Sequence, residues 1–132
     1  MTLATWSQAL AVAGGAAAGG LLRWQASLWL NRPDSLLPLG TLVVNAAGGL
    51  LIGLAMALLP REAHDPWRLL LVTGFLGGFT TFSAFSAESL TLLMRGAPGW
   101  ALLHSAAHVL GALACAAAGW QLGQWGRAGA AA

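Results

Sequence analysis

The feature that most constrains this chain is a series of apolar stretches, each long enough to cross a lipid bilayer. Segments rich in Pro, Gly and charged residues, at 31–35, 60–66 and 95–99, separate four such stretches, at residues 6–30, 37–59, 67–94 and 100–125. A transmembrane helix needs about 20 mostly apolar residues. We therefore expect four membrane-spanning helices, and the short connections predict that consecutive helices are antiparallel neighbours.

The composition is typical of a membrane protein and excludes several other classes. Of the 132 residues, 58% are hydrophobic and 8% are charged, whereas a soluble domain normally carries about 25% charged residues. A single Cys excludes a disulfide scaffold or a thiolate metal cluster. The six basic residues are all Arg and are spread singly along the chain, which is no nucleic-acid-binding patch. We expect one all-helical integral membrane domain over residues 1–132.

Tryptophans mark the ends of the predicted spans, because their amphipathic rings favour the headgroup level of a bilayer. Six of the seven lie near these ends: Trp6, Trp29, Trp67, Trp100, Trp120 and Trp125. The first span follows no basic segment and is longer than the apolar core of a signal peptide. We therefore expect it to remain in the protein as a helix.

The arginines are balanced across the predicted membrane. Three lie on the side that holds both termini, and three lie on or near the opposite side: Arg61, Arg68 and Arg127 against Arg23, Arg32 and Arg95. An excess of basic residues in the short loops of one side normally orients a membrane protein. Without that excess the chain can insert in both orientations, which makes an antiparallel dimer possible. The alternative is that a weak bias still orients every copy.

Each predicted span carries two glycines four residues apart. The pairs are Gly15 and Gly19, Gly49 and Gly53, Gly74 and Gly78, and Gly119 and Gly123. Such steps let helix backbones approach closely in lipid, where hydrophobicity cannot drive association. Chance matches are expected in a chain this rich in Gly and Ala, so only the set as a whole predicts tight packing. Four short helices enclose little volume, and we expect any pore to lie between two copies.

The middle of the third span, residues 74–86 (GFLGGFTTFSAFS), holds all four Phe of the protein. Its paired glycines and paired threonines are poor helix formers, so a break in the helix is predicted near residues 77–81. Broken backbone inside a membrane is tolerated only where its polar groups meet protein, water or an ion. A cation on the freed carbonyls satisfies that requirement. A packing notch, with Ser and Thr bonded back to the preceding turn, is the structural alternative.

Phe82 and Phe85 are three residues apart and share one face of the helix. Such a pair is commonly lipid-facing or core packing. It also has a second use, because the edge of a phenyl ring carries positive electrostatic potential. Ring edges can contact a dehydrated anion without trapping it by a full charge, which suits a small anion that must both enter and leave.

Two further polar residues lie inside the predicted spans and need partners there. Asn45 is central in the second span and either bridges helices or lines a wet path. Glu88 lies towards the end of the third span and is a functional acid or an ion-pair partner of Arg23 or Arg95.

The fourth span carries His104, Ser105 and His108, with the two histidines one helical turn apart. Because no third ligand of suitable type is evident nearby, metal binding by this pair is not expected. No acid is placed to orient a histidine, and the chain has neither a nucleophile elbow nor a phosphate loop. The sequence therefore predicts a protein that is not an enzyme.

Together these motifs resemble the CrcB/Fluc family of fluoride channels over nearly the whole chain. The resemblance rests on residues 14–23, on residues 40–53 and above all on residues 74–85 (GFLGGFTTFSAF), a highly specific string. It implies an antiparallel, dual-topology homodimer with two anion pathways. It also implies one structural sodium ion at the dimer centre, held on backbone carbonyls that map to Gly77 and Thr80.

The resemblance further implies which residues belong to the fluoride pathway. The matching positions are Phe82, Phe85, Asn45, Thr81, Ser83, Ser86, Glu88 and Arg23. In this mapping the two Phe present their ring edges, Glu88 lies at one end of the path and Arg23 lies at the aqueous vestibule. His104 and His108 stand where the family is expected to have a track of hydroxyls, so the path there is expected to be altered or pH-sensitive.

The function implied by the resemblance is passive, fluoride-selective export that lowers cytoplasmic fluoride, by a multi-pass protein of the inner cell membrane. Two other classes remain open from the residues alone. A proton-coupled small multidrug-type transporter would need a carboxylate central in the first helix, and residues 6–30 contain none. A non-conducting accessory subunit would use the glycine steps as its interaction surface.

Overall fold

The computed structural model describes residues 3–31 and 38–130, and within these ranges all of the regular structure is helical. In chain order the elements are α1 (Leu3–Leu30), α2 (Leu39–Leu58), the π-helix η1 (Arg68–Leu76), α3 (Gly77–Phe79), α4 (Phe82–Met94) and α5 (Pro98–Ala130). The predicted all-helical fold is confirmed for these residues. Arg32, most of the predicted turn at 31–35 and the first residue of the second predicted span lie outside them.

Within the described residues, three helical segments are long and apolar enough to cross a membrane: Leu39–Leu58, Arg68–Met94 and Pro98–Ala130. They correspond to the second, third and fourth predicted spans. The first predicted span forms α1, which has 28 residues but is not among these three segments. The chain is thus an all-helical protein with three clear candidate membrane spans.

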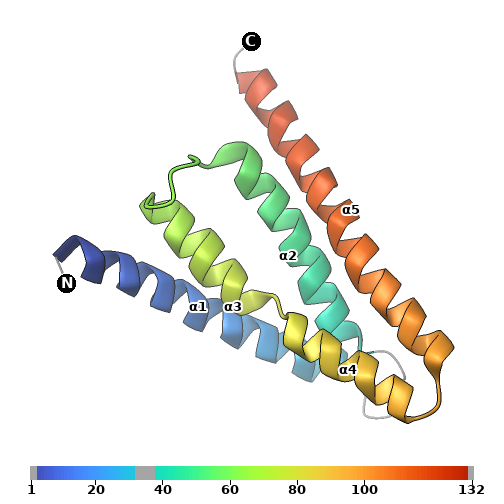
Figure 1. The fold of residues 1–132 in the computed structure, drawn as a ribbon. Coiled ribbons are helices and arrows are strands. Elements are labelled where there is room, and N and C mark those ends of the chain that lie inside the picture. The colour runs from blue at the N-terminus through green and yellow to red at the C-terminus, as the bar shows by residue number, and fades with distance from the viewer. Residues whose placement is uncertain (1–2, 32–37, 131–132) are drawn as a thin grey trace.

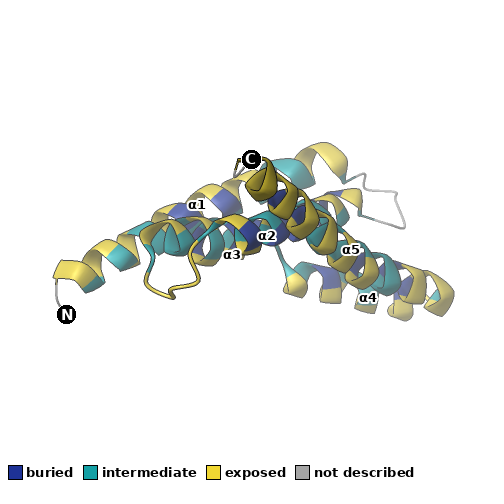
Figure 2. Cartoon of the chain, turned by 90° about the horizontal axis from the view of Figure 1, so that it is seen from above, coloured by how far each residue is buried: buried dark blue, intermediate teal, exposed yellow. Residues whose placement is uncertain are grey.

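The helices pack as two pairs (Figure 1). In one pair α2 lies along α5, and in the other α1 lies along η1 and α3. The buried residues sit on the helix sides that face each other, while the outward sides are exposed (Figure 2). Val44, Leu76 and Phe79 form a small buried cluster where the two pairs meet. The remaining exposed apolar surface is the surface that lipid or a second copy would cover.

Glycines set how closely each pair of helices approaches. A Cβ atom placed at Gly53 of α2 would lie less than 3.0 Å from the Ala116 carbonyl oxygen of α5, and one at Gly119 would meet Leu50 in the same way. In the second pair, a Cβ at Gly19 would meet the Phe75 carbonyl equally closely. The glycine steps therefore lie at the helix contacts, and the tight packing that they predict is confirmed.

The third predicted span is interrupted inside the molecule, as expected. Helix α3 ends at Phe79, and Thr80 and Thr81 are extended, with ψ angles of 159° and 119°. Helix α4 then begins at Phe82, with the Thr81 hydroxyl accepting a hydrogen bond from the Ala84 N–H at 3.1 Å. The Thr80 hydroxyl is bonded back to the Leu76 carbonyl at 2.8 Å. The break therefore falls on the paired threonines, at the end of the predicted range 77–81.

Candidate functional site

The extended backbone of the break is held by a side chain from another helix. Asn45 of α2 accepts a hydrogen bond from the Thr81 N–H through Oδ1 at 2.8 Å. Its Nδ2 donates to the Thr81 carbonyl at 2.9 Å. One amide thus satisfies both backbone groups of Thr81, which a regular helix would have paired internally. Asn45, expected either to bridge helices or to line a path, does bridge them.

Arg23 provides a second contact to the interrupted helix. Its Nε donates to the Gly78 carbonyl oxygen at 3.0 Å, and the side chain is half-buried between α1 and α3. Arg23 is therefore tied to the backbone next to the break. The alternative pairing of Glu88 with Arg23 or Arg95 does not occur, because within the described residues the ion-pair partner of Glu88 is His104.

Two carbonyl groups at the break lose the donors that a continuous helix would give them. In a continuous helix the Gly77 carbonyl would accept from the Thr81 N–H, but this N–H donates to Asn45 instead. The Thr80 carbonyl would likewise accept from the Ala84 N–H, but this N–H donates to the Thr81 hydroxyl. Carbonyl oxygens released in this way are ligands of the kind that alkali cations take at broken helices. Gly77 and Thr80 are the two residues predicted to hold sodium.

The two phenylalanines that follow the break touch each other but differ in exposure. The rings of Phe82 and Phe85 meet edge to face, with centroids 5.2 Å apart and planes at 61°. Phe82 is 77% exposed, whereas Phe85 is 8% exposed. Phe85 contacts the His104 and His108 rings, with centroid separations of 5.6 Å and 4.8 Å. One ring is thus free to meet lipid or a second chain while the other is built into the site.

The hydroxyl groups predicted near the path lie around the start of α4. Ser83 is exposed, and its Oγ lies 3.2 Å from the Thr81 hydroxyl. Ser86 is also exposed and donates to the Phe82 carbonyl of its own helix at 2.8 Å. Ser83 and Ser86 share the exposed side of α4 with Phe82.

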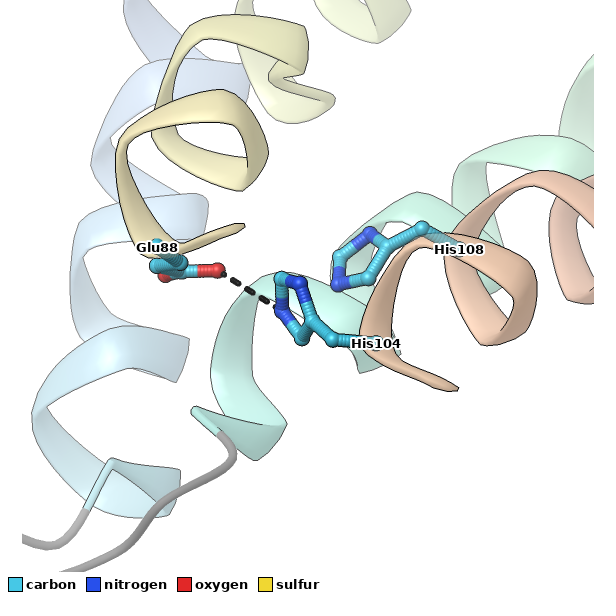
Figure 3. Close-up of side chains that lie close together, drawn as sticks. All are labelled: Glu88, His104 and His108. Carbon is cyan, nitrogen blue, oxygen red and sulfur yellow. Dashed lines mark ion pairs between the residues drawn. The ribbon is translucent and has the colours of Figure 1, made fainter. Parts of the chain in front are cut away.

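Glu88 joins α4 to both neighbouring helices. Its Oε1 accepts a hydrogen bond from the Thr41 hydroxyl of α2 at 2.5 Å. Its Oε2 lies 3.3 Å from His104 Nε2 of α5, as Figure 3 shows. The expectation that the histidine pair has no third ligand-type group nearby, and no acid to orient a histidine, is therefore wrong. Glu88 comes from a different helix, so its position depends on how α4 and α5 pack.

The hydrogen bonds around Asn45 also fix the tautomer of His108. Because Thr81 occupies the amide in both directions, Asn45 presents its NH₂ group to His108 Nδ1, at 3.2 Å. Nδ1 must then accept, so the ring proton lies on Nε2. This nitrogen is buried and has no hydrogen-bond partner within the described residues. His108 therefore has a buried N–H donor that no acceptor within the described residues uses.

A cavity of about 540 Å³ connects most of these groups. Seven of the predicted site residues are among those that line it: Asn45, Gly77, Thr80, Thr81, Phe82, Phe85 and His108. Arg23, Ser83, Ser86, Glu88 and His104 are not in its lining. The break, the phenylalanines and one histidine thus line the same cavity.

Two residues of this site were not predicted from the sequence. Thr41 is 3% exposed and holds Glu88. Ser89 holds His104, with Oγ 2.9 Å from Nδ1, and also lies 3.3 Å from the Ser105 hydroxyl. The spacing of Thr41 and Asn45, one helical turn apart, was a usable signal for Thr41. For Ser89 the only sequence signal was its position next to Glu88.

Comparison with known proteins identifies the family. The family model described as "CrcB-like protein, Camphor Resistance (CrcB)" matches residues 10–120. The chain belongs to the CrcB family. This matched region contains the break, both phenylalanines and the groups that surround them.

Curated relatives within this family align over most of the chain. A protein of Bordetella petrii is 56% identical over 114 residues, which cover 83% of this chain and 86% of the relative. A protein of Variovorax paradoxus is 52% identical over 107 residues, covering 79% and 84%. A protein of Pseudomonas aeruginosa is 47% identical over 126 residues, covering 90% and 99%. Each of these relatives carries the name fluoride-specific ion channel FluC.

Proposed function

We propose that this protein is a fluoride-specific ion channel that passively lowers cytoplasmic fluoride. The observation that carries the proposal is the alignment with channels of that name at about half identity across nearly the whole chain. The protein is not an enzyme. Ser89, His104 and Glu88 lie within contact distance of one another in the order hydroxyl, imidazole and carboxylate, as in a hydrolase triad. The chain nevertheless belongs to a family whose relatives carry the name of ion channels.

The protein lies in a membrane and crosses it several times. Three apolar helical segments support this location. The relatives are bacterial, which places the channel in the inner membrane. We further propose that α1 is the fourth span, since its 28 residues are long enough to cross and its glycines pack it along η1. Its Arg23 does not face lipid alone, because it is bonded to Gly78.

The active form in this proposal is an antiparallel homodimer of chains inserted in opposite orientations. The balanced arginines support dual insertion. Phe82 lies beside the break and is 77% exposed, so its ring is available for contact with a partner at that face. A path between two copies would then contain phenylalanine edges from both.

Fluoride is held, in this mechanism, by phenyl edges and neutral donors, while the charged Arg23 and Glu88 lie at the vestibule and at one end of the path. Phe82 and Phe85 offer ring edges, Asn45 anchors the break, and His108 lines the same cavity. The other path residues are Thr81, Ser83, Ser86, Glu88, Arg23 and His104. Neutral donors bind a dehydrated anion without trapping it, which allows rapid release.

A structural sodium ion fits the carbonyl groups at the break. Gly77 and Thr80 would hold it through their backbone oxygens, which lack helical donors, and the second subunit would supply the matching pair. When bound, sodium supplies positive charge at the dimer centre and a link between the chains.

The driving force needs no coupling to a second substrate. Hydrogen fluoride crosses bilayers as a neutral weak acid and dissociates in a near-neutral cytoplasm, so fluoride accumulates inside when the medium is acidic. An interior-negative potential of 100 mV is worth about 2.3 kcal/mol per charge. That energy holds internal fluoride roughly 50-fold below the external level at equilibrium.

The proposal is tested by fluoride efflux from proteoliposomes loaded with potassium fluoride and started with valinomycin. We expect rapid fluoride loss, negligible chloride loss from matched vesicles and roughly fivefold slower fluoride loss with Phe82→Ile, since an aromatic contact is worth about 1 kcal/mol. A folded dimer that passes no fluoride would overturn the proposal. Equal fluoride and chloride loss would overturn its selectivity.

A further inference from the structure

We propose that Glu88, His104 and His108 form a binding site for a divalent transition-metal ion such as Zn²⁺, and that the bound metal blocks the channel. The binding part stands on the geometry of these three residues. The blocking part rests on the proposed fluoride function, because it needs a path to block.

The three side chains come from two helices and converge on one point (Figure 3). One ligand atom from each residue lies within 4.8 Å of the others. Glu88 Oε2 and His104 Nε2 are already 3.3 Å apart. Two ligands of a tetrahedral ion, each about 2.0–2.1 Å from the metal, lie roughly 3.3 Å from each other. Small side-chain rotations therefore complete the arrangement.

Each residue also has one buried polar atom without a hydrogen-bond partner in the described structure: Glu88 Oε2, His104 Nε2 and His108 Nε2. The two histidines are 2% and 5% exposed. Buried polar atoms normally have hydrogen-bond partners. Glu88 Oε2 and His104 Nε2 face each other only as an ion pair at 3.3 Å, and His108 Nε2 has no partner within the described residues, so one ligand shared by all three atoms would satisfy the cluster. A metal ion coordinated by two imidazoles and a carboxylate does so.

Outer contacts hold the ligands in place. Ser89 Oγ lies 2.9 Å from His104 Nδ1, which leaves Nε2 of that ring for the metal. The Thr41 hydroxyl occupies Glu88 Oε1 and leaves Oε2. Metal-binding histidines and carboxylates are generally oriented by partners of this kind on their remaining atoms.

His108 links the metal to the helix break. Its Nδ1 accepts from Asn45 when the ring proton is on Nε2. A metal on Nε2 moves the ring proton to Nδ1, and the contact with Asn45 must then lengthen, because Thr81 fixes the amide. Metal binding thus puts a double positive charge on a residue that lines the cavity and disturbs the contact that holds the break. An anion in the path would be held rather than passed.

The chemistry of the ligands selects the ion. Two imidazole nitrogens and one carboxylate oxygen suit Zn²⁺ and its neighbours Co²⁺, Ni²⁺ and Cu²⁺. Mg²⁺ and Ca²⁺ prefer all-oxygen sites. Three protein ligands leave a fourth position open, which water or a halide can fill.

The experiment uses two readouts on the full-length protein. Co²⁺ titration in detergent reports binding through its visible absorption, without any need for transport. Fluoride efflux from proteoliposomes, with and without Zn²⁺, reports block, as a ratio to each variant's own rate. The variants are His104→Gln, His108→Gln and Glu88→Gln. The last keeps a side-chain oxygen that accepts the hydrogen bond from Thr41. His64→Gln is the matched control, because His64 is an exposed histidine in the loop before η1.

We expect one Co²⁺ per chain with a tetrahedral spectrum, and at least about tenfold weaker binding in each of the three variants. His64→Gln should bind like the parent, and Zn²⁺ should slow parent efflux at least about tenfold while leaving the three variants' own rates nearly unchanged. No Co²⁺ binding, or binding lost only in His64→Gln, would overturn the site. Binding without slowed efflux would overturn the block. If the parent passes no fluoride, the titration still decides the metal site, and the two failures remain distinct.

Discussion

Asn45 and Thr81 are joined by two hydrogen bonds, in which one side-chain amide both accepts from and donates to the backbone of a single residue. The contact connects α2 to the point where the third apolar segment is interrupted. Because Thr81 is also the N-cap of α4, the same residue starts the following helix. The position of the break relative to the rest of the fold therefore depends on one asparagine.

Replacing Asn45 should destabilise the protein. Asn45→Ala leaves the Thr81 N–H and carbonyl without partners, and each unpaired buried group costs about 1–3 kcal/mol. We expect a loss of about 2–4 kcal/mol, seen as a lower melting temperature in detergent. Gln124→Ala, an amide removed from the exposed side of α5, is the control and should melt like the parent. Equal melting of the two variants would show that the amide does not hold the break.

Adjacent glycines on α1 should respond in opposite ways to alanine. A Cβ at Gly19 would collide with the Phe75 backbone, whereas a Cβ at Gly20 meets nothing within 4 Å. Gly19→Ala must push η1 away from α1, so we expect a loss of at least about 2 kcal/mol, as for other overpacked contacts. Gly20→Ala should be neutral or stabilising by up to about 1 kcal/mol, because Ala is the better helix former. Melting curves measured side by side check this, and equal destabilisation would contradict the packing described for Gly19.

Removing sodium should weaken the dimer. An ion that binds only the assembled form stabilises it by mass action, by about 2.7 kcal/mol when its concentration is 100 times Kd. We therefore expect a lower melting temperature, and more monomer by size-exclusion chromatography, in N-methylglucamine chloride than in sodium chloride at equal ionic strength. Equal melting temperatures and equal monomer fractions in the two salts would remove sodium from the proposal. The proposed fluoride path does not depend on that outcome.

Added arginines should fix the orientation of the chain. Ala63→Arg with His64→Arg adds basic residues to the loop on the side of the termini, and that side should then face the cytoplasm. We expect this variant expressed alone to give little fluoride efflux, because antiparallel pairs cannot form. The opposite variant, Ala97→Arg with Gly99→Arg, should also fail alone and restore efflux when both are co-expressed. Full activity of either variant alone would argue against an antiparallel dimer.

Much of this site follows from local sequence properties. The break is predicted by four poor helix formers, Gly77, Gly78, Thr80 and Thr81. Low helix propensity destabilises the local helical backbone whatever the helix packs against. The glycine steps predict close approach for the same reason, since a missing Cβ is a local property. The exact end of α3 at Phe79 follows from the partners that Thr81 finds on α2.

The place of Glu88 could not be predicted in the same way. The sequence gives its neighbours on α4, but its actual partners are Thr41 and His104, which lie 47 and 16 positions away along the chain. Arg23 likewise finds its partner at Gly78, 55 positions away. Such pairs depend on the rotation and register of whole helices, and one residue of difference in either would separate them.

The sequence by itself determined that this chain is an all-helical membrane protein of the CrcB family with an interrupted third apolar segment. The length of the apolar segments, the glycine spacing and the specific motif are properties of short stretches of sequence. Their physical effects act on neighbouring residues. Only the tertiary structure decided that α4 and α5 place Glu88 beside His104 and His108. That arrangement depends on close contact between helices distant in sequence, where steric fit selects one register and so determines which polar atoms meet.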